Sequence, residues 1–166
     1  MSLIAEYGLD SASRTLLTLA LSIKDKRQQK AMDILHIQKI IRYFEYLRQR
    51  NEIDFSNYHL GGVSYELEEN IETLRDCGLV DKTDNRYVLS EMGEQAAKEL
   101  ENRLEHNELQ KLVFAKDQLN DLPTDELMFF MYKLLPETQR YSTEFARLNE
   151  KKDLIVRSLF LKGRIN

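Results

Sequence analysis

The residue types that most often carry catalysis or bind metal ions are few and widely spaced in this chain. Its three histidines, His36, His59 and His106, share no metal-ligand spacing with one another or with the single cysteine, Cys77. No glycine-rich phosphate loop occurs among its six glycines. Asp76 precedes Cys77 and disfavours a thiolate, so we expect this cysteine to be a small buried residue at a helix end. The sequence therefore predicts no catalytic site, no metal site and no cofactor.

Charged side chains are a second source of chemistry, because they attract nucleic-acid phosphates or oppositely charged proteins. The net charge of -4 conceals an uneven distribution. Residues 24–50 carry eight basic and three acidic side chains, whereas residues 51–110 carry five basic and fifteen acidic ones. The basic segment favours contacts with phosphates, and the acidic region favours a basic protein partner.

Candidate DNA-contacting residues come from a basic segment, the helix after it, the start of the next helix and a predicted hairpin. They are Lys24, Lys26, Arg27 and Lys30, then Lys39 and Arg42, then Ser64 and Tyr65, and finally Lys82 and Arg86. Lysine and arginine contacts with phosphates would position the protein on DNA without selecting a sequence. The ring of Tyr65 is of a type that stacks on bases.

Hydrophobic spacing predicts the elements that would position these residues. Asp33 and Ser64 are each typical of a helix cap, and Gly78 is typical of the residue that ends a helix. The apolar positions behind the caps are Ile34, Ile37, Ile41 and Phe44 in one helix, and Leu67, Ile71 and Leu74 in the next. Each set recurs at helical spacing, so both segments are predicted to be amphipathic helices.

Residues 79–89 predict a two-stranded hairpin. Asp84 and Asn85 lie at its centre, and both residue types tolerate the positive φ of a two-residue turn. The expected cross-strand pairs are Val80 with Leu89 and Lys82 with Tyr87.

A longer helix is predicted after a cap at Ser90, and its apolar face changes side near Asn107. Either the helix breaks there or one continuous helix contacts two partners, and we favour the second interpretation. The first helix is apolar on nearly every side over residues 16–23, so the rest of the protein or a partner must cover it. Both features favour a homodimer formed through the first helix and the carboxy-terminal helices.

The carboxy-terminal third is predicted to be helical. Residues 122–136 form a helix with almost no polar face, and we expect the cluster 128–132 to be core rather than a ligand pocket. A last helix is predicted to carry Phe145, Leu148, Ile155 and Leu159. The expected organisation is an amino-terminal helix and basic segment over 1–32, a domain over 33–105 and a helical region over 106–166.

The apolar run over residues 16–23 is far too short to cross a bilayer. Acidic Glu6 and Asp10 precede it, where a signal peptide would be basic. A lone cysteine also fits a reducing compartment. We therefore expect a cytoplasmic protein.

Residues 70–96, NIETLRDCGLVDKTDNRYVLSEMGEQA, resemble the wing and following helix of MarR-type and PadR-type regulators. The residues that match their pattern are Leu74, Gly78, Leu79, Val80, Tyr87, Leu89, Ser90, Glu91 and Gly93. Upstream, the series Ile37-Gln38-Lys39, Tyr58, Gly61-Gly62 and Ser64-Tyr65-Glu66-Leu67 is similar to that of YwgA-like winged-helix proteins, from which it departs at Gly62 and Val63. The resemblance covers about residues 33–100. It implies a mostly α chain with a small β-hairpin, in which additional helices flank a winged helix-turn-helix domain.

The outward face of the presumptive recognition helix bears on the choice of function. With Leu67 facing the core, Tyr65, Glu69, Glu72 and Asp76 point outward at about 100° per residue. Three carboxylates in a major groove would repel the DNA phosphates. The resemblance implies a dimeric DNA-binding transcription regulator, whereas the three acidic residues favour a module that binds a basic protein. An enzyme is the third and least supported alternative.

Overall fold

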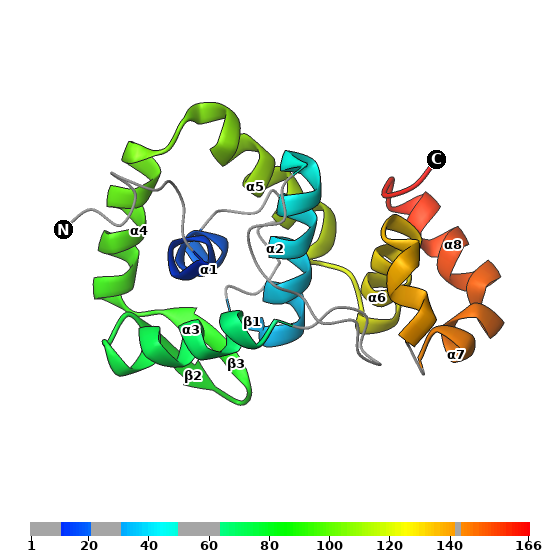
Figure 1. Cartoon of the computed structure of the whole chain (residues 1–166), viewed down its shortest axis with the longest axis horizontal. Coiled ribbons are helices and arrows are strands. Elements are labelled where there is room, and N and C mark those ends of the chain that lie inside the picture. The colour runs from blue at the N-terminus through cyan, green and yellow to red at the C-terminus, as the bar shows by residue number, and fades with distance from the viewer. Residues whose placement is uncertain (1–10, 21–30, 50–63, 142–143) are drawn as a thin grey trace. The chain divides into compact units, whose positions relative to one another are not determined.

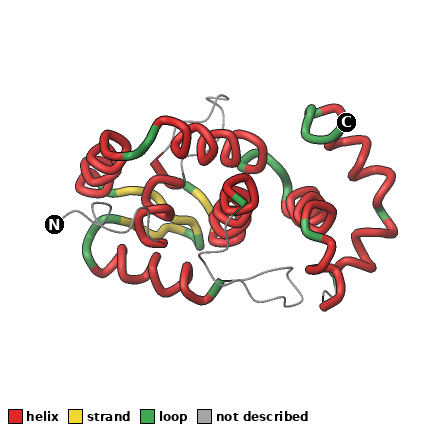
Figure 2. Tube along the Cα trace, turned by 45° about the horizontal axis from the view of Figure 1, so that its top comes forward, coloured by secondary structure: helices red, strands yellow, loops and turns green. Residues whose placement is uncertain are grey.

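The structure is a computed structural model that describes residues 11–20, 31–49, 64–141 and 144–166. The chain is mostly helical with a small three-stranded antiparallel sheet (Figures 1 and 2). The chain divides into two compact units, with a boundary between Asn120 and Asp121. This boundary falls inside residues 106–166, which the sequence analysis treated as one helical region. Within the described residues, no helix has the length and apolar character needed to span a bilayer.

The first unit combines helices with the sheet. Its elements are α1 (Ser11–Ala20), β1 (Met32–Asp33), α2 (Ile34–Arg48), α3 (Tyr65–Asp76), β2 (Val80–Thr83), β3 (Arg86–Leu89), α4 (Glu91–Arg103) and α5 (His106–Leu119).

Helix α1 is the centre of the first unit. It packs against α2, α3, α4, α5 and β3, and Figure 1 shows it end-on with these helices around it. Leu16, Leu17 and Leu19 point in different directions from α1 and are all buried. Over residues 13–19, both the apolar and the polar side chains of α1 are buried, so its own chain covers it on every side, whereas residues 21–23 of the predicted apolar run lie outside the described residues. One of the two reasons for expecting a homodimer is thereby removed.

The predicted caps and hairpin are confirmed. Asp33, Ser64 and Ser90 each accept a hydrogen bond from a backbone N–H in the first turn of the helix that follows. Strand β3 lies between β1 and β2 in the sheet. Asp84 and Asn85 have φ of 51° and 63°. The observed pairs include Val80 with Leu89 and Lys82 with Tyr87, as the sequence predicts.

The long helix predicted after Ser90 is two helices, so the continuous helix that we favoured is wrong. Leu104 and Glu105, between α4 and α5, have extended backbone with ψ of 148° and 136°. The turn allows Ala97 of α4 to be buried in the same unit as Leu112 and Leu119 of α5, which packs along α2. The apolar face changes side because the chain turns there. The second reason for expecting a homodimer is therefore also removed.

The second unit is entirely helical in the residues that are described. It comprises α6 (Thr124–Leu134), the 3₁₀ helix η1 (Pro136–Tyr141), α7 (Phe145–Glu150) and α8 (Lys152–Leu161). Helix α6 packs against each of the others, and its residues 127–132 are all buried, as expected for core. The last helix was predicted as one element, but Lys151 leaves helical geometry, with φ of -101° and ψ of 10°, and separates α7 from α8.

Polar contacts fix the orientation of α8 on α6. The Glu126 carboxylate accepts hydrogen bonds from Lys162 Nζ at 3.0 and 3.1 Å and from the Ser158 hydroxyl. Arg164 donates to both oxygens of Asp121 at 2.8 Å. The side of α8 that carries Ser158 therefore faces α6.

Candidate interaction surface

Local sequence fixes which side of α3 faces the solvent. Leu67, Ile71 and Leu74 are buried, so the stripe that they form is the inner side of the helix, as predicted. At its first turn, the Ser64 hydroxyl accepts a hydrogen bond from the Leu67 N–H at 3.2 Å. The buried Gln38 side chain of α2 donates to the Ser64 carbonyl at 3.2 Å. These contacts hold the start of α3 against α2 and leave its opposite side outward.

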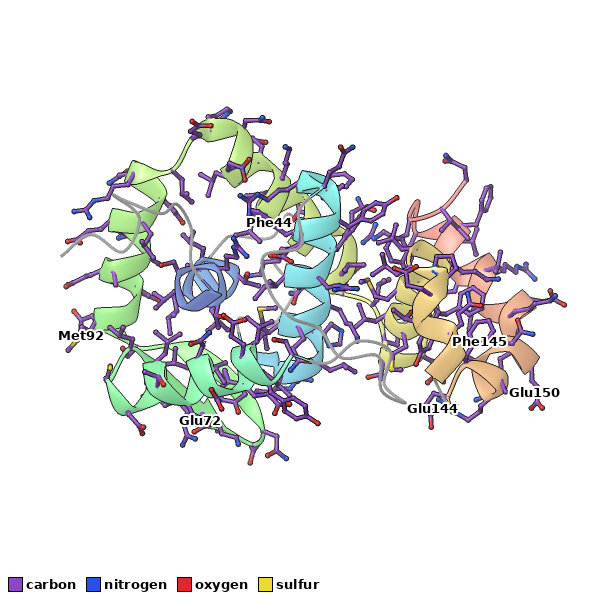
Figure 3. All side chains as sticks on the ribbon, viewed as in Figure 1. Phe44, Glu72, Met92, Glu144, Phe145 and Glu150 are labelled. Carbon is purple, nitrogen blue, oxygen red and sulfur yellow. The ribbon has the colours of Figure 1, made fainter. Side chains whose placement is uncertain are left out.

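The outward side of α3 carries Tyr65, Glu69, Glu72 and Asp76, all of which are exposed. Their spacing of four, three and four residues places them in one stripe along the helix. Glu72 is labelled in Figure 3. Its carboxylate accepts hydrogen bonds from Arg75 Nη1 at 2.8 Å and from the Tyr87 hydroxyl at 3.3 Å, and the second contact ties α3 to β3. We call these four residues the α3 stripe. It presents three carboxylates and one aromatic ring.

The hairpin does not offset the charge of the α3 stripe. Asp81, Lys82, Asp84 and Arg86 are all exposed, so the hairpin is charge-neutral. Residues 64–89 together carry seven acidic and three basic side chains. The Lys82 Nζ lies 5.3 Å from the centroid of the Tyr87 ring, and Arg86 donates to the Ala31 carbonyl at 3.3 Å. The surface formed by α3 and the hairpin is therefore acidic.

The residues predicted to contact DNA do not form one basic surface in the described part of the chain. Lys82 and Arg86 are exposed on the hairpin, and Arg42 is half-buried. Lys39 is 1% exposed and Ser64 is fully buried. The prediction that these two side chains lie on the surface and contact DNA is therefore wrong. Both belong to the packing between helices. The segment of Lys24, Lys26, Arg27 and Lys30 lies outside the described residues.

Lys39 should instead shape the pH dependence of folding. Burial lowers its pKa to about 7, and the neighbouring Arg42 lowers it as well. From about pH 7 up to 10.5, its ordinary value, an unfolded chain keeps this proton whereas the folded chain releases it. The free energy of unfolding therefore rises with pH across that range, by up to about 1.4 kcal/mol per pH unit from this group. Below about pH 7 both states hold the proton, and the cost of burying the cation applies in full.

We expect Lys39→Met to stabilise the protein at pH 7 and to flatten the rise in stability between pH 7 and pH 10. Urea denaturation followed by circular dichroism at several pH values measures the slope. Lys98→Met, at an exposed position on α4, is the matched control and should leave the slope unchanged. Equal slopes for Lys39→Met and the parent protein would contradict this assignment.

Other buried charges around α1 were not predicted. Arg14 of α1 pairs with Glu45 of α2 at 2.5 Å, and both side chains are 2% exposed. Lys116 of α5 is 4% exposed and donates to the Leu19 carbonyl at 3.4 Å. Burial lowers the pKa of Lys116 to about 8. The sequence signal was an arginine in a helix that has to be covered on all sides, since such a charge requires a buried partner.

The residues with catalytic or metal-binding potential are also placed. Cys77 caps the end of α3 and is exposed, so the expectation that it is buried is wrong. Gly78 adopts φ of 78° immediately after it, which turns the chain away before packing can cover the thiol. The His36 Nδ1 lies 2.9 Å from the Asp33 carboxylate, and His106 begins α5 at an exposed position. His59 lies outside the described residues. Among the residues that the structure covers, no group of histidine, cysteine, aspartate and glutamate could hold a metal ion.

These features make α3 the best-defined surface for binding in the first unit. Its orientation is fixed by a buried stripe, a cap and a contact to the sheet, and the three charged residues of the α3 stripe are all acidic. No protein-family model matches the sequence, and no curated protein or solved structure is significantly similar to it.

Proposed function

We propose that the first unit is a winged-helix module that binds a basic partner protein through the α3 stripe. The order of elements supports the winged-helix assignment: a helix, a short strand, two helices and a hairpin whose second strand pairs with the first strand. The resemblance of residues 70–96 to MarR-type and PadR-type regulators points the same way. Winged helices serve both DNA and protein recognition, so the function depends on the chemistry of the exposed helix.

The observation that carries the proposal is the charge of the outward side of α3. Glu69, Glu72 and Asp76 lie where a winged-helix regulator would approach the major groove, and carboxylates there repel phosphates. The same carboxylates attract lysine and arginine side chains of a protein and steer their approach. Tyr65 adds an aromatic ring of a type that is frequent in the centres of protein interfaces.

We expect Glu69→Lys with Asp76→Lys to weaken binding of a basic probe by at least about tenfold, or ~1.4 kcal/mol. Both residues are exposed, so the fold should tolerate the change. The probe is a fluorescein-labelled helical peptide with lysine and arginine on one face, and fluorescence anisotropy measures its binding at about 50 mM salt.

The matched control is Glu99→Lys with Glu150→Lys, which changes the net charge equally at exposed positions outside the α3 stripe. The control should retain binding within about threefold, or ~0.7 kcal/mol. Equal weakening by the two double variants would show that total charge, rather than the α3 stripe, attracts the peptide. Absence of peptide binding to the parent protein would also count against the proposal.

The second candidate function is a transcription regulator that contacts DNA through its hairpin and basic segments. The exposure of Lys82 and Arg86 on β2 and β3 favours it. If both contact phosphates, Lys82→Ala with Arg86→Ala should reduce the slope of log affinity against log salt by about 1.8, from about 0.9 per contact. An electrophoretic shift with duplex DNA tests this. No shift even at about 50 mM salt would eliminate the second candidate.

A further inference from the structure

The three carboxylates of the α3 stripe differ in the contacts that they make. The Glu72 carboxylate lies 2.8 Å from Arg75 Nη1, and it also accepts the hydrogen bond from the Tyr87 hydroxyl at 3.3 Å. In the part of the chain that the structure describes, the carboxylates of Glu69 and Asp76 form no ion pair and accept no hydrogen bond from a side chain. The charge of Glu72 is therefore balanced within the fold, whereas the charges of Glu69 and Asp76 are not.

The three carboxylates also project in different directions from α3. At about 100° per residue, Asp76 and Glu69 lie at about 180° and 200° from Leu67, directly opposite the buried side of the helix. Glu72 lies at about 140° and is turned toward Arg75, which lies at about 80°. The side chains of Arg75 and Glu72 are 37% and 50% exposed. Glu72 is therefore at the edge of the α3 stripe, on the side of its own cation.

A further positive charge lies on the side of α3 where Glu72 contacts the hairpin. The Lys82 Nζ of β2 is 5.3 Å from the centroid of the Tyr87 ring, and the hydroxyl of that ring donates to Glu72. A partner cation that approached Glu72 would therefore come near both Arg75 and Lys82, and like charges at short range repel. Glu69 and Asp76 lie away from this edge, where the approach of a cation meets less repulsion.

We infer that Glu69 and Asp76 determine the affinity of the α3 stripe for its basic partner, and that Glu72 serves the contact between α3 and β3. Each of the two unpaired carboxylates would take one cation of the partner. They are seven residues apart, or about 10.5 Å along the helix at 1.5 Å per residue. This inference rests on the proposed function, and it names the residues that perform it.

Removal of the two unpaired charges is the first part of the test. Glu69→Gln with Asp76→Asn changes two exposed carboxylates to amides of nearly the same size, so the fold should be retained. We expect this variant to bind the fluorescein-labelled basic peptide at least about fivefold more weakly than the parent protein, or ~1 kcal/mol. Fluorescence anisotropy with the full chain at about 50 mM salt measures the affinity.

Removal of the balanced pair is the second part of the test. Glu72→Gln with Arg75→Gln removes one charge of each sign, and the glutamine at position 72 can still accept the hydrogen bond from the Tyr87 hydroxyl. This variant should bind the peptide within about twofold of the parent protein, or ~0.4 kcal/mol. Glu99→Gln with Glu150→Gln is the control for net charge, because it removes two exposed carboxylates outside the α3 stripe. It should also stay within about twofold.

The outcomes separate this inference from the proposed function. A loss of affinity confined to Glu69→Gln with Asp76→Asn supports both. Equal weakening by the two α3 variants would overturn the inference, because Glu72 would then contact the partner, but the α3 stripe would remain the binding surface. Equal weakening by the Glu99 and Glu150 control, or no binding of the peptide to the parent protein, would overturn the proposed function and the inference together. Circular dichroism confirms that each variant is folded.

Discussion

Gly93→Ala is expected to lower the free energy of unfolding of the first unit by about 3 kcal/mol, the upper range for overpacking. A Cβ at Gly93 would lie 2.0 Å from the Leu79 carbonyl oxygen and 3.2 Å from a methyl carbon of Leu89. The Leu79 carbonyl also accepts a hydrogen bond from the Ser90 N–H at 3.0 Å. Helix α4 would have to move away from the hairpin to make room. Urea denaturation followed by circular dichroism measures the loss.

Gly78→Ala is the control for Gly93→Ala. Gly78 has φ of 78°, and apart from its chain neighbours no residue has an atom within 4 Å of the place where its Cβ would be. Its substitution incurs only the conformational cost of a left-handed residue, about 1–2 kcal/mol. If Gly93→Ala were no more destabilising than Gly78→Ala, the close approach of α4 to Leu79 would be wrong.

The second large effect is expected at the buried ion pair of Arg14 and Glu45. Glu45→Leu should destabilise the first unit by about 3–5 kcal/mol, because it leaves the Arg14 cation buried beside an apolar side chain. The free energy of unfolding of a native protein is typically about 5–15 kcal/mol. A loss of this size should therefore bring the variant close to unfolding at room temperature. Chemical denaturation with far-ultraviolet circular dichroism measures the effect.

The double variant Arg14→Met with Glu45→Leu separates the cost of burying the Arg14 cation without the Glu45 carboxylate from the loss of packing. Apolar side chains of similar size can replace a buried ion pair at little cost, so the double variant should be more stable than Glu45→Leu alone. A double variant as unstable as the single one would show that the loss of packing at Glu45, rather than the buried charge of Arg14, causes the instability.

The local elements of the first unit were predictable because their signals are short-range. The Asp33, Ser64 and Ser90 caps and the turn at Asp84 and Asn85 act over two to four residues. The apolar residues Leu67, Ile71 and Leu74 predicted which side of α3 is buried. The residues of the α3 stripe were then predicted as those on the opposite side. The close approach at Gly93 gives a physical reason for a glycine three residues after the Ser90 cap.

The parts that sequence reasoning missed depend on which elements meet in space. Lys39 was expected on the exposed side of its helix because lysine is charged. The helix is covered on that side as well, so the side chain is buried. The change of face near Asn107 was visible in the sequence, yet periodicity alone could not distinguish a turn at Leu104 from a second partner. Arg14 could be paired with Glu45 only once α1 was known to lie against α2.

The most direct test of the central claim maps the binding surface on the protein. In a titration of the ¹⁵N-labelled chain with the unlabelled basic peptide, the largest amide shift changes should fall on α3, around Glu69, Glu72 and Asp76. Duplex DNA added in place of the peptide should leave these amides unperturbed. Shift changes from DNA on α3, or from the peptide only outside α3, would contradict the account.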